Sequence, residues 1–127
     1  MAIQVKWLDD DKKTVVREFV GAWTWEEFYA SQDEVNVLLR SVDYNVHQIM
    51  DFRQASRALP ANTLTHIGHS GKAVPPNRGK SIVVVQNAFF KQMYGLLDRI
   101  FPSVTERVVL VATFEEALET LRAGEKS

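Results

Sequence analysis

Aspartate side chains stand where two predicted strands end, and carboxylates in such places can take part in phosphoryl transfer. Asp51 closes the run "YNVHQIMDF" after a stretch of apolar residues, and Asp9 and Asp10 follow the first β-rich run, "IQVKWL". Acids of this kind can hold a divalent cation that neutralises a phosphoryl group during its transfer. The first question is therefore whether Asp51 is a phosphoacceptor or only the last residue of a strand.

A receiver domain of a phosphorelay uses such acids, but two features of the chain argue against one. The acids of "DDDKK" lead into a second β-rich run, "TVVREFV", where a receiver domain would have a helix. A receiver also needs a lysine at the end of its final strand, and "RVVLVATF" has Thr113 there. We therefore interpret Asp51 as a strand-end residue.

Two short motifs resemble nucleotide and metal sites without completing them. "GKS" at 79–81 lacks the earlier glycine of a phosphate-binding loop, because Val74 stands there, and it opens a strand instead of a helix. His66 and His69 are three residues apart, but no carboxylate lies nearby to complete a metal site. The sequence therefore predicts no metal and no cofactor.

The residue types of a Ser-His-Asp triad are present, for example as Ser56, His66 and Asp51, but their presence alone does not make a triad. No nucleophile-elbow motif supports it, and such a triad depends on geometry. We expect no catalytic residues and therefore no enzyme. An enzyme with an unrecognised site would need a cleft that gathers Asp51, His47 or His66.

The composition predicts a single globular domain over residues 1–127. The chain is 46% hydrophobic and 24% charged, and it contains no cysteine, as is common in a reducing cytoplasm. No signal peptide and no membrane span are expected. All 16 acidic residues lie in residues 1–51 or 98–127. In the stretch between them, every charged residue is basic. This asymmetry suggests an anionic partner, although central strands of an α/β sheet also tend to lack acids.

Hydrophobic periodicity predicts an α/β fold with the order ββαβαβαβα. Two β-rich runs joined by "DDDKK" form an antiparallel hairpin, and the later strands, separated by helices, pair in parallel. Helix starts are marked by capping boxes at Thr24 with Glu27 and at Thr113 with Glu116. The predicted helices cover 22–42, 59–67, 87–101 and 113–124; the predicted strands cover 3–8, 14–20, 44–52, 81–86 and 107–112.

The helix at 87–101 has an unusually wide apolar face, which spans an arc of roughly 160°. One interpretation is that its flank touches neighbouring helices. The other is that Phe90, Tyr94 and Phe101 form an exposed aromatic edge for a partner, a second copy of the chain or an apolar ligand.

The element order resembles the STAS domain, the anti-sigma-factor-antagonist fold, and especially the small stand-alone STAS-like proteins of bacteria. The segments "IMDFRQASRALPANTL" and "VATFEEALETL" carry the likeness. It implies a non-catalytic regulatory domain that binds a protein partner. Regulatory members are phosphorylated on a serine of an Asp-Ser-Ser-Gly stretch, which falls here at "PANT". Pro60 and Asn62 stand where the aspartate and the modified serine would be, which argues against a kinase-controlled switch, although Thr63 is adjacent.

The same region predicts a partner or anion site. Arg53 and Arg57 follow the strand that ends at Asp51, and the helix start near Asn62 and Thr63 offers free backbone N–H groups. The partner would be a protein or a second copy of the chain.

The charge distribution and the aromatic residues bear on two other classes of partner. Arg78 and Lys80 precede the next strand and should lie at the opposite end of the sheet, which disfavours nucleic acid. The alternative function is a carrier of a small apolar or anionic, lipid-like ligand. Its apolar surface would come from the three tryptophans Trp7, Trp23 and Trp25 and from the aromatic helix at 87–101. Arg53 and Arg57 would bind the head group.

Overall fold

The computed structural model describes residues 2–56, 60–63, 65–66, 75–86, 88–100 and 102–125, without the side chains at 89, 90, 103, 104, 124 and 125. Its elements are β1 (Ile3–Trp7), β2 (Thr14–Gly21), α1 (Trp25–Arg40), β3 (Val46–Ala55), β4 (Arg78–Val84), α3 (Ala88–Ile100), α4 (Pro102–Thr105), β5 (Val108–Val111) and α5 (Phe114–Glu125). Between β3 and β4, Thr63, Thr65 and His66 are helical.

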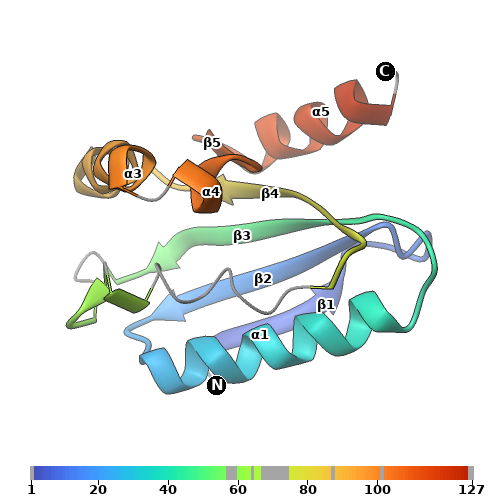
Figure 1. Ribbon diagram of the computed structural model, residues 1–127, viewed down its shortest axis with the longest axis horizontal. Helices are drawn as coiled ribbons and strands as arrows, with labels where there is room; N and C mark the ends of the chain where they lie inside the picture. The colour runs from blue at the N-terminus through green and yellow to red at the C-terminus, as the bar shows by residue number, and fades with distance from the viewer. Residues whose placement is uncertain are drawn as a thin grey trace.

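The five strands form one sheet in the order β1-β2-β3-β4-β5, as Figure 1 shows. Strand β1 pairs with β2 antiparallel, and the other pairs are parallel, which confirms the predicted fold class. The hairpin forms because Asp9 accepts the backbone N–H of Asp11 at 3.0 Å and Lys12 takes a left-handed φ of 56°. The acids of "DDDKK" therefore build a turn.

The strand order decides which face of the sheet each helix covers. Strands β2 to β5 lie side by side in chain order, and right-handed crossovers then place their connecting helices on one face. Helix α1 packs on that face, which we call the α1 face. The final helix, α5, packs on the opposite face, which we call the α5 face, against Val16, Ile49 and Ile82.

The buried residues in the described ranges form three core clusters. Two lie on the α1 face: an aromatic one and an aliphatic one. The third lies on the α5 face. Their buried members are Ile3, Phe19, Trp23, Trp25 and Phe28; Val15, Val35, Leu39 and Val46; and Val16, Ile49, Ile82, Val84, Val111, Ala117 and Leu121. Among the residues that the structure describes, the members of both clusters on the α1 face fall within residues 2–55.

The sequence signals for α1 are confirmed. Thr24 and Glu27 form the reciprocal capping box, with the Glu27 N–H donating to the Thr24 hydroxyl at 3.1 Å. The rings of Trp23 and Phe28 lie 5.8 Å apart, so the residue before the cap packs on the first turn of the helix.

Two strand boundaries differ from the prediction. Strand β3 continues to Ala55, so Asp51 lies inside the strand and the prediction that it ends the strand is wrong. Strand β4 begins at Arg78, although its first residues still lie at the opposite end of the sheet from Asp51, as expected. The pairing of β3 with β4 shifts between Val46 and Gln48. Gly79 lies against the His47 ring there, where the Cβ of any other residue would collide with it.

Two helix boundaries also differ. Pro102 does not simply end the preceding helix but begins the short helix α4, a position where its missing N–H costs no helical hydrogen bond. Helix α5 continues to Glu125, so Gly124 does not end it.

Candidate partner-binding site around strand β3

Asp51 and Arg53 form a two-pronged ion pair on β3. Arg53 Nε and Nη2 donate to the two carboxylate oxygens at 2.9 and 2.8 Å, and its backbone N–H adds a third bond at 3.1 Å. The Asp51 side chain is 5% exposed and that of Arg53 41%. Burial alone would raise the pKa of Asp51, but the hydrogen bonds and charge of Arg53 hold it below its ordinary value. Asp51 is therefore ionised at neutral pH.

Arg53 also connects β3 to α5. Its guanidinium lies 5.0 Å from the centre of the ring of Phe114, which is the first residue of α5. The charges of two neighbouring residues also act on this pair. The charge of Lys6 lowers the pKa of Asp51, and the charge of Glu18 raises the pKa of Arg53. An anion that approached Arg53 would have to compete with Asp51.

Asn62 and Thr63 lie in the segment of residues 60–63 and 65–66, which we call the post-β3 segment. The backbone N–H of His66 donates to the Asn62 carbonyl at 3.1 Å, which confirms a helix start at this point. Asn62 is exposed with a left-handed φ of 63°. Thr63 is only 8% exposed, and its hydroxyl donates to the Pro60 carbonyl at 2.6 Å.

The post-β3 segment is fixed to α1 by its aromatic residues. Trp25 Nε1 donates to the Ala61 carbonyl at 2.9 Å, and the Tyr29 hydroxyl lies 2.8 Å from His66 Nδ1. The rings of Trp25 and His66 stack with centres 4.7 Å apart. His66, considered from sequence only as a ligand or catalytic base, therefore contacts α1. No spacing rule could indicate a partner 37 residues away.

The structure divides the predicted site between the two faces of the sheet. Asp51 and Arg53 are brought together on the α5 face, whereas Asn62 and Thr63 lie beside α1. Arg57 is outside the described residues. The partner role of these five residues remains a prediction.

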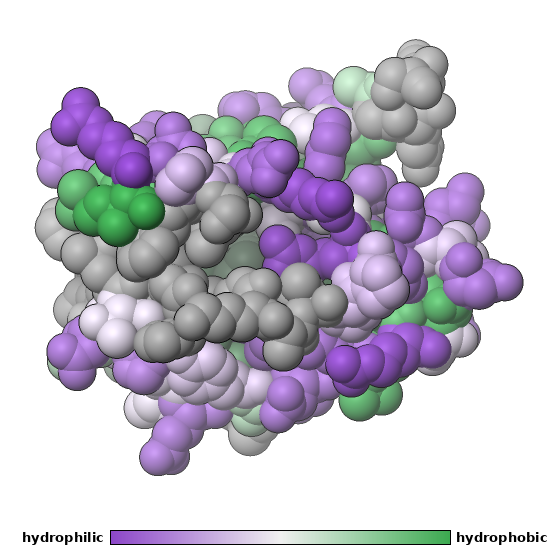
Figure 2. All heavy atoms as spheres, viewed as in Figure 1, coloured by the Kyte–Doolittle hydropathy of each residue, from purple (hydrophilic) through white to green (hydrophobic). Residues whose placement is uncertain are grey.

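The predicted aromatic edge of α3 is described only at Tyr94. This residue is half-buried, and its hydroxyl donates to the Val108 carbonyl at 3.2 Å, so it contacts β5. Burial and the nearby Asp98 raise its pKa. The Phe90 side chain and Phe101 lie outside the described part. Leu96 and Ile100 are the exposed apolar side chains described on α3, and Figure 2 shows a hydrophobic patch over this helix, at the left of the view.

Arg17 is the residue that sequence reasoning missed. It lies on β2 beneath α1 and is 1% exposed. Its partners among the described residues are all neutral: Ser31 Oγ at 2.8 Å, the Phe28 carbonyl at 2.9 Å, Gln32 at 3.2 Å and Gln48 at 3.4 Å. Burial, with the charge of Arg78, lowers the pKa of Arg17 to about 9, so it stays charged at neutral pH. The alternation Val15, Arg17, Phe19 could have placed it on the buried face.

The remaining candidates do not gather into a catalytic or metal site in the described part of the chain. His47 Nδ1 accepts the Lys80 N–H at 2.9 Å, which ties β3 to β4. Among the residues that the structure describes, no three His, Asp or Glu side chains could share a metal ion. None of the described helices is long and apolar enough to cross a bilayer.

Comparison with solved structures identifies the fold. An anti-sigma factor antagonist from Mycobacterium paratuberculosis matches with a TM-score of 0.55 and 16% identity, over 94% of each chain. The anti-sigma factor antagonist SpoIIAA in its unphosphorylated form matches with a TM-score of 0.57 and 16% identity, over 96% of this chain and 97% of that one. No family model and no curated protein matches the sequence. The chain therefore has the STAS fold, as its element order predicted.

Proposed function

We propose that this chain is a non-catalytic regulatory domain that acts by binding a protein partner. The observation that carries the proposal is the extent of the structural match: two anti-sigma factor antagonists align over at least 94% of every chain compared. Folds alone do not fix function, so the partner surface has to be argued from this chain's own residues. A cytoplasmic location belongs to the proposal and is supported by the absence of cysteine.

The proposed partner surface is the post-β3 segment together with the first turns of α1. Ala61 and Asn62 are exposed there, and Tyr29 and His66 are half-buried beside them. The bonds from Trp25 to Ala61 and between Tyr29 and His66 hold the segment in one position before any partner arrives. Such preorganisation reduces the entropy lost on binding.

We propose that binding is not switched by phosphorylation of Thr63. Its hydroxyl is buried and donates to the Pro60 carbonyl, so a kinase would first have to open this turn. A phosphate there would bring nearly two negative charges into a buried position, which costs free energy without a cationic partner. The neighbouring Asn62 carries an amide, which no kinase modifies.

The carrier function is less well supported, because the tryptophans assigned to it are used in the core. Trp23 and Trp25 are buried and lie edge to face with centres 5.0 Å apart, and Trp7 packs on the aliphatic cluster of the α1 face.

Site-directed photo-crosslinking tests the proposed surface. A photoreactive residue replaces Ala61 in one protein and Glu119, an exposed residue of α5, in the control. We expect position 61 to give one discrete adduct in host cells, identified by mass spectrometry, and position 119 to give none. Light scattering then separates a second copy from a different protein as the partner. Equal labelling at both positions, or a monomer without adducts, would count against the proposal.

A matched pair of substitutions tests the contribution of Asn62. Asn62→Gly removes the side chain, and glycine still accepts the left-handed backbone of this position. The control, Asn45→Gly, removes the side chain of another exposed asparagine, which lies before β3. We expect the first change to weaken partner capture and the second to leave it unchanged, with similar melting temperatures. Identical capture by both variants would exclude Asn62 from the contact.

A further inference from the structure

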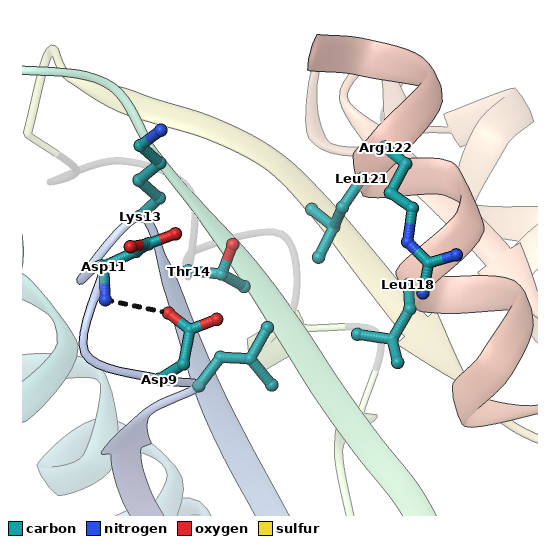
Figure 3. A pocket seen from close by; sticks show the side chains of 8 residues that line it. Asp9, Asp11, Lys13, Thr14, Leu118, Leu121 and Arg122 are labelled. Atoms are coloured by element: carbon teal, nitrogen blue, oxygen red, sulfur yellow. Dashed lines mark hydrogen bonds between the residues drawn. The ribbon is translucent and has the colours of Figure 1, made fainter.

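A groove of about 440 Å³ lies on the α5 face, between the β1–β2 turn and the second half of α5 (Figure 3). It is at the opposite end of the strands from Ala55, so it is separate from the proposed partner surface. Its volume falls within the range of roughly 300–1,000 Å³ typical of small-molecule sites. The lining residues are Leu8, Asp9, Asp11, Lys13, Thr14, Leu118, Leu121 and Arg122.

The base of the groove is aliphatic. Leu121 is buried within the core cluster of the α5 face, and Leu8 and Leu118 pack against that cluster. These three side chains are supported from below, so they present a fixed apolar surface to whatever enters the groove. Branched aliphatic groups match such a surface in shape.

Thr14 supplies a hydroxyl between the two walls (Figure 3). The residue is only 5% exposed, and no hydrogen bond joins its hydroxyl to any residue within the described ranges. The hydroxyl oxygen is not fully buried, so it can be reached from the groove and can both donate and accept a hydrogen bond there. Something in the groove, water or a ligand, is therefore expected to bond to it.

The two walls of the groove carry opposite charge. On the turn, two carboxylates, Asp9 and Asp11, outnumber one ammonium, Lys13, whereas α5 contributes Arg122. Asp9 is oriented by its bond to the Asp11 N–H, which leaves its other oxygen directed toward the groove (Figure 3). No ion pair joins the walls in the portion of the chain that the structure describes. The opposite charges therefore stay apart across an apolar base.

We propose that this groove binds a small aliphatic zwitterion, such as a free branched-chain amino acid. The ammonium group lies toward Asp9, the carboxylate toward Arg122, and the aliphatic side chain on Leu8, Leu118 and Leu121. The Thr14 hydroxyl bonds to one of the two polar ends. A zwitterion joins both walls and leaves no net charge behind, whereas an amine or an acid alone satisfies one wall only.

Calorimetric titration with three related ligands tests this inference. L-leucine carries both charges, 3-methylbutylamine lacks the carboxylate and 4-methylpentanoate lacks the ammonium group. We expect saturable binding of leucine and about tenfold weaker binding of each analogue, because a hydrogen bond to a charged group contributes a factor of this order. Equal binding of all three would overturn the charge assignment.

Two variants connect each charge to its wall. Asp9→Asn retains an oxygen for the Asp11 N–H, so the turn persists, and Arg122→Gln changes an exposed side chain. We expect Asp9→Asn to weaken leucine and the amine but not the acid, and Arg122→Gln to weaken leucine and the acid but not the amine. Asp33→Asn, on the exposed side of α1, is the charge-matched control.

Thr14→Val separates a ligand site from a hydrated groove. The substitution keeps the shape of the side chain and removes the hydroxyl, so we expect weaker leucine binding at an unchanged melting temperature. If leucine fails to saturate up to its solubility limit in the unmodified protein, or if none of the groove variants alters its binding, the groove holds water only and the inference is wrong. This outcome would leave the proposed partner surface untouched.

Discussion

Two arginines on opposite faces of the sheet are held by different chemistry. Arg17 lies beneath α1, is almost completely buried and bonds to neutral oxygens of described residues. Arg53 lies beside α5, is substantially exposed and bonds to the carboxylate of Asp51. Each guanidinium also lies over a phenylalanine ring, Phe28 for Arg17 and Phe114 for Arg53.

The difference shows what burial demands of a charged side chain. Removing a guanidinium from water is expensive, so nearly every N–H of Arg17 has an acceptor, drawn from α1 and β3. Arg53 keeps part of its hydration and needs fewer bonds. We expect changes at Arg17 to affect the whole fold, and changes at Arg53 to affect mainly the contact between β3 and α5.

The largest expected effect comes from Arg17→Ala. The change leaves a cavity and removes the donors for Ser31, Gln48 and the Phe28 carbonyl, so we expect a loss of roughly 3–5 kcal/mol in the free energy of unfolding. Chemical denaturation with urea measures it. Arg17→Met fills most of the volume and should recover part of the loss. If Arg17→Ala cost no more than Arg53→Ala, the comparison between the two faces would fail.

A smaller effect, with a distinct pH dependence, is expected for Asp51→Asn. The amide still accepts a hydrogen bond but lacks the charge, so we expect a loss of about 1 kcal/mol at neutral pH. The folded-state pKa of Asp51 is lowered, so its contribution is complete above the unfolded value of 3.8 and disappears as the pH falls through the lower folded pKa.

Urea titrations of the unmodified protein and Asp51→Asn between pH 7 and more acidic conditions measure this dependence. We expect the difference between the two proteins to shrink as the pH falls below the unfolded pKa of 3.8. A difference that stays constant across this range would mean that the charge of Asp51 does not stabilise the fold.

The smallest effect concerns the ring beneath Arg53. A double-mutant cycle with Arg53→Met and Phe114→Leu should give a coupling energy of about 0.5–1 kcal/mol, since the guanidinium is partly exposed. The same cycle with Glu119→Gln in place of Phe114→Leu serves as the control, because Glu119 is an exposed residue further along α5. A coupling energy of zero would show that the ring and the guanidinium only lie near each other.

The parts of the fold that depend on local sequence could be predicted, and those that depend on distant contacts could not. The turn after Trp7 and the cap at Thr24 involve residues within a few positions of each other, and both were confirmed. The ion pair between Asp51 and Arg53 was not predicted. The predicted strand ended at Phe52, so Arg53 was expected in the loop that follows. A strand that continues puts residues two apart on the same face.

Contacts across the fold left no pattern in the sequence. Nothing in the spacing links Tyr29 to His66, or Trp25 to the Ala61 carbonyl, yet these bonds position the proposed partner surface. Arg17 is intermediate between the contacts that local sequence predicts and those that it does not. Its place in the alternation indicates the buried face, but its acceptors on α1 and β3 become visible only when those elements pack together.

The described members of both α1-face clusters fall within residues 2–55, which has a consequence for how the molecule forms and opens. A nascent chain presents all the described side chains of these clusters once β3 has emerged from the ribosome, before β4 and β5 have emerged. The cluster beneath α5 needs residues from β2 to the last helix, so it is completed last. We expect amide protons of β5 and α5 to exchange with solvent through partial openings that leave the hairpin, α1 and β3 protected.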